Sequence, residues 1–167
     1  VYVTAVGNLP DGWIEAVVEK FEMSKNCFDG GQAPLYPPKF TPGTKHHPRQ
    51  IEQIHVDIGY PAVPASSKER YKYAIFSSML GQGMSSLLFQ RIREELGLVY
   101  NISAFLHLSS LAGILGIYFA CSPSNLNRVM EECESVLAAI VRKGVPQQAF
   151  ELAKARIRQG VLMAQDD

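Results

Sequence analysis

The sequence predicts an α+β fold, a two-layer sandwich in which helices pack on a mixed, mainly antiparallel sheet. Strand-like runs of alternating or β-branched residues are separated by segments whose apolar residues recur at helical spacing. Two of the strand-like runs are joined by a hairpin-length connection, which is typical of an antiparallel pair. The remaining connections contain helices, and helical crossovers allow parallel pairing as well.

The first part of the chain is predicted to form a strand, a turn and a helix. Residues 1–6 are a β-branched run typical of a mostly buried strand, and residues 7–12 are rich in turn formers. Apolar residues at helical spacing predict a helix over residues 13–24. Residues 26–49 contain five of the ten prolines, which block helix formation, so we expect a long loop or linker there.

The next strand and helix follow this loop. Residues 52–60 alternate between apolar and polar side chains and predict a half-buried strand, which we expect Pro61 and Pro64 to end. Ser66 or Ser67 can cap the following helix. That helix carries Tyr71, Ala74, Ile75, Ser78 and Met79.

A glycine-containing turn then separates two helices. Gly81 and Gly83 flank Gln82 and interrupt the helical pattern, and Ser85 or Ser86 can begin a second helix. Gly97 is placed as the residue just after the end of that helix. The second helix bears Leu88, Phe89 and Ile92.

A hairpin and two helices complete the pattern. Residues 99–107 and 113–120 are the adjacent strand-like runs. A helix ending at Gly144 and a last helix beginning near Pro146 follow. The predicted apolar stripe of the first of these is Leu126, Val129, Met130, Cys133, Leu137, Ile140 and Val141. The predicted apolar stripe of the last is Phe150, Ala153, Ile157, Val161 and Ala164.

The composition predicts a single globular domain over residues 1–167. The chain has 16 Lys+Arg, 16 Asp+Glu and 47% apolar residues. A net charge of zero supplies no bulk field for nucleic acid or an anionic membrane, so neither is an expected partner. Three scattered cysteines without a CxxC pair favour a reducing compartment. Because the chain begins without Met and stops within a helical pattern, we expect a fragment of a longer protein.

Local spacing predicts neither a metal site nor a nucleophile. None of the four histidines stands in an HxxEH or HxxxH motif. His55 and His107 fall on predicted strands, where we expect them to be exposed or hydrogen-bonded. Ser85 and Ser86 lack a GxSxG elbow, and the GQG turn lacks the phosphate-loop pattern. We therefore assign no catalytic residue to this chain alone.

Arg93 and Tyr100 flank the segment Glu-Glu-Leu-Gly-Leu-Val and could converge at one edge of the sheet, because Gly97 lets the chain reverse between them. A guanidinium and a phenol together can hydrogen-bond a peptide carbonyl or an oxyanion. Alternatively, Arg93 complements the helix C-terminus and Tyr100 is an ordinary strand aromatic. The spacing leaves both interpretations open.

The segment GQGMSSLLFQRIREELGLVYNISAF resembles the family of zinc metallopeptidases that includes pitrilysin, insulin-degrading enzyme and the mitochondrial processing peptidase. Members often show a glycine-rich turn, then M-S-S-x-L-F-x-x-I-R-E, then G-L-x-Y at the start of a strand. The first strand, turn and helix, the strand EQIHVDIGYPA and the last pair of helices are also similar to the family. The resemblance covers nearly the whole chain.

The resemblance implies that this chain is the second, non-zinc half of such an enzyme. In the family, two homologous α+β halves face each other around a cavity, and zinc is bound by HxxEH in the first half. The second half contributes an Arg and a Tyr that bind the substrate, at positions that match Arg93 and Tyr100. The resemblance thus implies substrate binding by Arg93, Tyr100, Gly81 and Gly83, with the Gly81–Gly83 turn at the cavity wall, where substrate or the partner half can approach. It implies no metal in this half, zinc in the partner half, and a peptide substrate.

An alternative is a structural or assembly subunit resembling the core proteins of the cytochrome bc1 complex, without proteolytic activity. Retention of the Arg–Tyr pair favours the peptidase interpretation. In either case this half alone should be inactive. The central segment is more similar to bacterial members, so we expect a cytoplasmic location ahead of a periplasmic or mitochondrial one.

Overall fold

The computed structural model describes residues 7, 9–22 and 36–163, and the chain divides into two compact units, residues 1–35 and 36–167. In the first unit, α1 (Trp13–Glu22) confirms the predicted helix. The strand expected over residues 1–6 and the last residues of the expected helix lie outside the described residues. A single domain over residues 1–167 stays a prediction.

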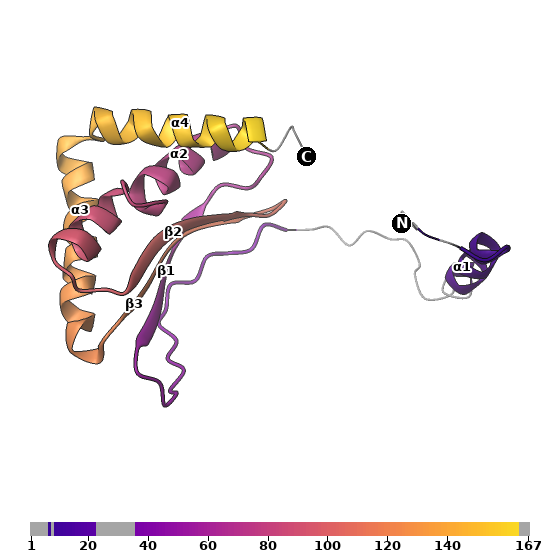
Figure 1. The fold of residues 1–167 in the computed structure, drawn as a ribbon, viewed down its shortest axis with the longest axis horizontal. Helices are drawn as coiled ribbons and strands as arrows, with labels where there is room; N and C mark the ends of the chain where they lie inside the picture. The colour runs from indigo at the N-terminus through magenta and orange to yellow at the C-terminus, as the bar shows by residue number, and fades with distance from the viewer. Residues whose placement is uncertain (1–6, 8, 23–35, 164–167) are drawn as a thin grey trace. The chain divides into compact units, whose positions relative to one another are not determined.

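The second unit is built on a three-stranded antiparallel sheet (Figure 1). Its strands are β1 (Ile54–Ala62), β2 (Asn101–Leu108) and β3 (Gly113–Cys121), in the order β1-β3-β2. The predicted hairpin is confirmed as β2 and β3, whose connection closes with a 2.8 Å bond from the Ser109 N–H to the Ala112 carbonyl. The α+β fold class is therefore confirmed.

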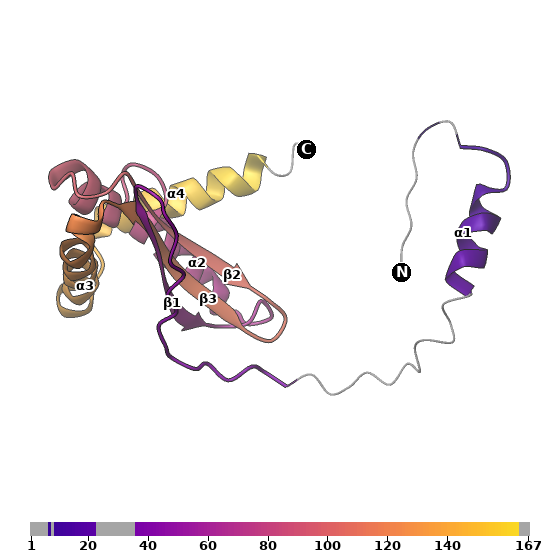
Figure 2. The same ribbon diagram turned by 90° about the horizontal axis from the view of Figure 1, so that it is seen from below.

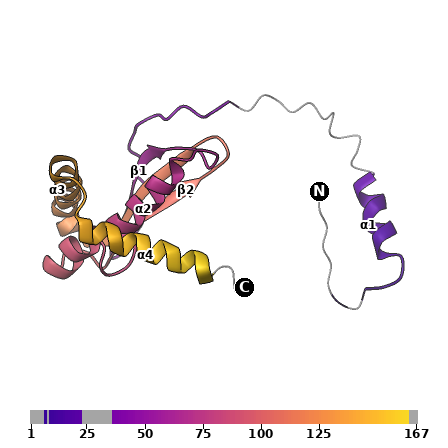
Figure 3. The ribbon, with the colours of Figure 1, turned by 90° about the horizontal axis from the view of Figure 1, so that it is seen from above.

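Helices cover one face of this sheet (Figures 2 and 3). They are α2 (Arg70–Gly81), the π-helix η2 (Phe89–Glu95), the short η3 (Pro123–Asn125), α3 (Leu126–Lys143) and α4 (Gln147–Met163). In Figure 1, α4 runs alongside α2, and α3 lies beside η2. None of the helices in the described ranges is both long and apolar enough to cross a bilayer.

The core lies between the helices and the covered face of the sheet. Strand residues alternate between the two faces, so alternate residues at the start of β2 and the end of β3 enter the core. The core cluster contains Leu80, Leu88, Phe89, Ile92, Leu98, Val99, Ile102, Ala104, Ile117, Phe119, Cys121, Val129 and Cys133. The opposite face carries polar side chains at the end of the sheet where β2 begins.

The strand β1 ends between the two prolines that were expected to end it, after Pro61 and before Pro64. The strand continues through Pro61, which pairs with Ile114 of β3, and ends at Ala62. Among the described residues, β1 is an edge strand of this sheet and pairs with β3 alone. A proline lacks the N–H that an interior strand requires, but an edge strand tolerates it because one side of its ladder is unused.

The expected cap of α2 at Ser66 or Ser67 was wrong. The helix begins at Arg70, and its N-cap residue Glu69 makes no side-chain cap bond. Ser67 instead stabilises the preceding turn, because its Oγ accepts a 3.2 Å hydrogen bond from the Glu69 N–H. A serine within a turn can satisfy such a donor without starting a helix.

Two predicted core positions are exposed. Val141 is 86% exposed at the end of α3, and Val161 is 55% exposed near the end of α4. Both continue the apolar period of their helices, but they lie in last turns that the rest of the unit does not cover. Helical periodicity indicates the face of a helix and not how far along its length that face is packed.

Candidate functional site

An open pocket lies at the end of the sheet where β1 and β2 begin and β3 ends. Its volume is about 400 Å³. The antiparallel register puts Ala120 of β3 directly between His55 of β1 and Asn101 of β2, on the face opposite the helices. The residues that line the pocket are Gln53, His55, Arg93, Tyr100, Asn101, Tyr118 and Ala120.

Arg93 and Tyr100 reach this pocket from the two sides of a turn at Gly97. The backbone of Gly97 has a φ of +60°, which glycine adopts without a Cβ clash, and its N–H donates to the Arg93 carbonyl at 3.2 Å. The Tyr100 N–H donates to the Ala120 carbonyl at 2.9 Å and ties the start of β2 to β3. Leu98, between them, is buried in the core. The turn is thus anchored to the core through Leu98, and the side chains of Arg93 and Tyr100 on its two sides are exposed.

The element that carries Arg93 is a π-helix, where the sequence predicts only a helix. π-helical turns are rare, and they occur frequently at functional sites. Phe89 and Ile92 bury one side of η2 in the core. Arg91 and Arg93 are two positions apart, so they do not share a side of the helix.

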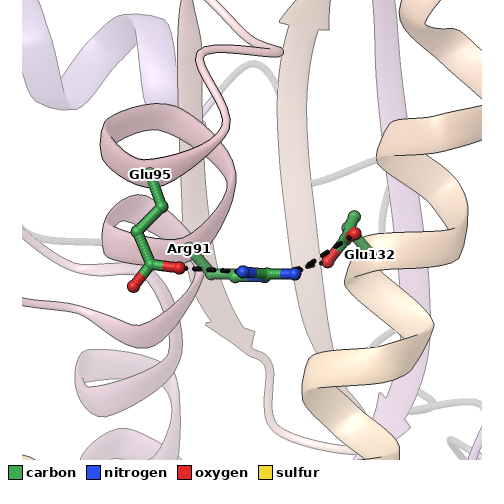
Figure 4. Close-up of polar contacts among 3 residues, drawn as sticks. All are labelled: Arg91, Glu95 and Glu132. Atoms are coloured by element: carbon green, nitrogen blue, oxygen red, sulfur yellow. Dashed lines mark hydrogen bonds and ion pairs between the residues drawn. The ribbon is translucent and has the colours of Figure 1, made fainter.

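Arg91 is held by carboxylates on two elements (Figure 4). Its Nη1 donates to Oε2 of Glu95 at 2.9 Å, and its Nε donates to Oε2 of Glu132 at 3.0 Å. The hydrogen bonds to Glu95 and Glu132 raise the pKa of Arg91. Because Glu132 belongs to α3, this exposed network connects η2 to α3 and contributes to the orientation of η2.

Arg93 has different surroundings. Its guanidinium carbon lies 4.7 Å from the centroid of the Phe89 ring, within the range of a cation–π contact. Within the part of the chain that the structure describes, no carboxylate forms an ion pair with Arg93. Tyr100, on the other side of the turn, is 75% exposed. The pocket therefore has a positive charge that no described acid neutralises, next to an accessible phenol.

His55 and Tyr118 form a hydrogen-bonded pair in the same pocket. The His55 Nδ1 and the Tyr118 hydroxyl are 2.8 Å apart, and the two rings are tilted with their centroids 6.0 Å apart. His55 is exposed and Tyr118 half-buried. Neither residue was a candidate from the sequence, although the expectation that His55 is exposed or hydrogen-bonded is confirmed.

The two glycines predicted to bind substrate lie elsewhere. Gly81 is buried where α2 crosses β2, and a Cβ on it would overlap the backbone nitrogen of Ala104. Gly83 has a φ of +77°. Neither glycine lines the pocket that contains Arg93 and Tyr100. A direct contact of these glycines with substrate remains a prediction, whereas the structure shows their steric role in a tight turn.

Arg156 of α4 holds this glycine turn, and sequence reasoning missed it. Its Nη2 donates to the Ser85 Oγ at 2.9 Å, and its Nη1 donates to the Ser78 carbonyl at 3.3 Å. A Cβ on Gly83 would lie 3.0 Å from that Nη2. The Arg156 side chain therefore adds a second donor to the Ser78 carbonyl, which also accepts from the Gln82 N–H, and fills the space that Gly83 leaves.

The described residues do not fit a metal site or a reactive thiol. Among them, no group of three or more His, Cys, Asp and Glu residues is placed to hold a metal ion. Burial, with smaller contributions from Glu132 and Glu134, raises the pKa of Cys133 to about 12. Burial also raises the pKa of Cys121. Both thiols therefore stay protonated near neutral pH, and the thiolate is the form that reacts or binds metal.

Comparison with known proteins identifies the family of this chain. The family model described as "Peptidase M16 inactive domain" matches residues 1–157. The chain is 31% identical over 172 residues to an uncharacterized zinc protease of Mycobacterium bovis, covering 99% of this chain and 39% of that protein. It is 26% identical to an uncharacterized zinc protease of Bacillus subtilis, covering 98% of this chain and 40% of that protein. The chain thus spans about two fifths of these relatives.

Solved structures share the fold. A conserved protein from Enterococcus faecalis superposes with a TM-score of 0.70 at 17% identity, covering 96% of this chain and 38% of that one. A protease from Helicobacter pylori superposes with a TM-score of 0.68 at 16% identity, covering 97% and 41%. The chain belongs to the Peptidase M16 family, as its inactive domain. The resemblance to zinc metallopeptidases is therefore confirmed.

Proposed function

We propose that this chain is the substrate-binding half of a zinc metallopeptidase. In this role Arg93 and Tyr100 hold a peptide beside a zinc-bearing homologous half, which is on the same chain or on a separate subunit. The observation that carries the proposal is the convergence of these two side chains on one pocket, across a turn that is anchored in the core. The names of the relatives as zinc proteases, and their greater length, support a partner half.

The pocket suits a peptide for two physical reasons. It is open, so an extended chain can enter along the surface, and its lining is made mostly of groups that donate hydrogen bonds. A guanidinium and a phenol can bind the carbonyl oxygen of a peptide bond, and the same donors can stabilise that oxygen when it gains negative charge. Hydrolysis itself belongs to the partner half in this proposal.

We also propose that the Gly81–Gly83 turn adjoins the substrate cavity. Met84 at its tip is 73% exposed, whereas Gly81 is buried. Arg156 and Gln90 fix the turn, since the Gln90 Nε2 donates to the Met84 carbonyl at 2.7 Å. In this proposal the glycines affect substrate binding by setting the shape of the turn.

Tyr100→Phe in the parent protein tests the central claim. We expect peptide turnover to fall about tenfold, because one hydrogen bond to a developing charge is lost, while the zinc content stays unchanged. Hydrolysis of a quenched fluorescent peptide and metal analysis measure the two quantities. Tyr36→Phe is the matched control, because Tyr36 is 78% exposed and does not line the pocket.

Unaltered turnover in Tyr100→Phe would show that the role given to Tyr100 is wrong. A parent protein that assembles but hydrolyses no peptide, and whose sequence has no HxxEH half, would favour the structural or assembly role instead.

A further inference from the structure

The pocket of Arg93 and Tyr100 has a donor-rich lining without an acid. Of its seven lining residues, six carry polar side chains and none is Asp or Glu. The nearby acids Glu52, Asp57 and Glu94 are exposed and do not line it, although Asp57 lies opposite Tyr118 in the strand register. A neutral peptide carbonyl needs one or two donors, whereas this pocket offers a full positive charge and several donors around it.

Arg93 differs from Arg91 in that its charge forms no ion pair with a described carboxylate. Arg91 is bound by Glu95 and Glu132 on the other side of η2. The guanidinium of Arg93 contacts the Phe89 ring, and no described carboxylate pairs with it. Guanidinium groups bind carboxylates through two parallel hydrogen bonds, which are stronger than bonds between neutral groups.

The His55–Tyr118 pair adds a donor in either of its proton arrangements. If the Tyr118 hydroxyl donates to the His55 Nδ1, the imidazole carries its proton on Nε2, which is free to donate. If the Nδ1–H donates to the Tyr118 oxygen, the Tyr118 hydroxyl proton is free to donate instead. The pair therefore presents a hydrogen-bond donor next to Arg93 and Tyr100 in both tautomers.

We propose that this pocket is a carboxylate-recognition subsite, in which Arg93 and the His55–Tyr118 pair select peptides with an acidic side chain or a free C-terminal carboxylate. The proposal rests on the proposed function, because it takes the ligand to be a peptide. It adds His55 and Tyr118 to the binding residues and makes the charge of the substrate a determinant of specificity.

The test uses the parent protein and a series of matched peptides. One peptide contains a single Glu, the second has Gln at that position, and each is made with a C-terminal carboxylate and with a C-terminal amide. Equilibrium binding is measured by fluorescence anisotropy with zinc removed by a chelator, and KM and kcat are measured on the zinc-loaded protein. The Glu/Gln arm tests the side chain, and the acid/amide arm tests the C-terminus.

We expect the preferred carboxylate peptide to bind about tenfold more tightly than its neutral counterpart, with the difference in KM and not in kcat. Arg93→Gln should remove this preference, and Tyr118→Phe should reduce it about threefold by freeing His55. Arg128→Gln is the matched control and should keep the preference, because Arg128 is exposed on α3 and does not line the pocket.

Equal binding of all four peptides would overturn the proposal, as would a preference that survives in Arg93→Gln. These outcomes are separable from failure of the proposed function. The binding measurement needs no hydrolysis, so a carboxylate preference together with normal turnover in Tyr100→Phe would reject only the role of Tyr100. Loss of turnover in Tyr100→Phe with no carboxylate preference would reject only the subsite.

Discussion

The two faces of the β1–β3–β2 sheet differ in what they do. On the covered face, Ile117 and Phe119 of β3 are fully buried beneath the helices. On the open face, the next residues along the same strand, Tyr118 and Ala120, line the pocket. Because strand residues alternate in direction, one strand supplies both the core and the lining of the pocket. Residues that stabilise the fold and residues of the proposed binding pocket are therefore single steps apart in the sequence.

Among the variants that test the difference between the two faces, Phe119→Ala should lower the free energy of unfolding the most. Truncation of a fully buried Phe removes packing and leaves a cavity, and we expect the free energy of unfolding to fall by about 3–5 kcal/mol. Urea unfolding of the protein measures it. The adjacent Tyr118→Phe is the control and should cost less than about 1 kcal/mol. Similar losses in both variants would contradict the separation of the two faces.

Gly81→Ala tests the covered face at the point where α2 meets β2. The new Cβ would overlap the backbone nitrogen of Ala104, which cannot move without shifting the strand. We expect a loss of about 3 kcal/mol in unfolding free energy. Gly160→Ala is the matched control, because no atom lies within 4 Å of its Cβ position in α4. That control should be neutral or stabilising by up to about 1 kcal/mol.

Gly116→Ala makes the same change on the open face and should have the smallest effect. The added Cβ would overlap the Phe105 ring, but this ring is a half-buried side chain that can turn aside. The lower entropy cost of folding with Ala offsets part of the strain, so we expect a loss of about 1 kcal/mol or less. Thermal unfolding compared with Gly81→Ala measures the difference. A loss as large as that of Gly81→Ala would show that the open face is packed as tightly as the core.

Most elements of the second unit could be predicted because their signals are local. A few neighbouring residues suffice to predict the strand that contains Tyr60, the helix end at Gly97 and the hairpin before Gly113. The errors have non-local causes. A strand tolerates a proline such as Pro61 when it lies at the edge of a sheet, and strand pairing, not the local sequence, decides which strand is at the edge. The π-helical geometry of η2 has no recognised composition signal.

The candidate site could be predicted only in part. Arg93 and Tyr100 are joined by a short turn, so their convergence could be proposed from spacing, and the motif around them indicated the family. His55 and Tyr118 are 63 positions apart in the sequence, and nothing local indicates that their side chains meet. Arg156 likewise reaches Ser78 across a separation of 78 positions.

The sequence by itself determined the class of fold and the approximate positions of most of the described helices and strands, because periodicity and turn residues act over short distances. The spacing of Arg93 and Tyr100 left two interpretations open, and the role proposed for them came from the resemblance of the motif around them. The tertiary structure alone decided the rest of the site. The register that puts Ala120 between His55 and Asn101 fixes which polar side chains surround Arg93. That register depends on burying one face of all three strands together, and a shift by one residue would turn every one of these side chains to the other face.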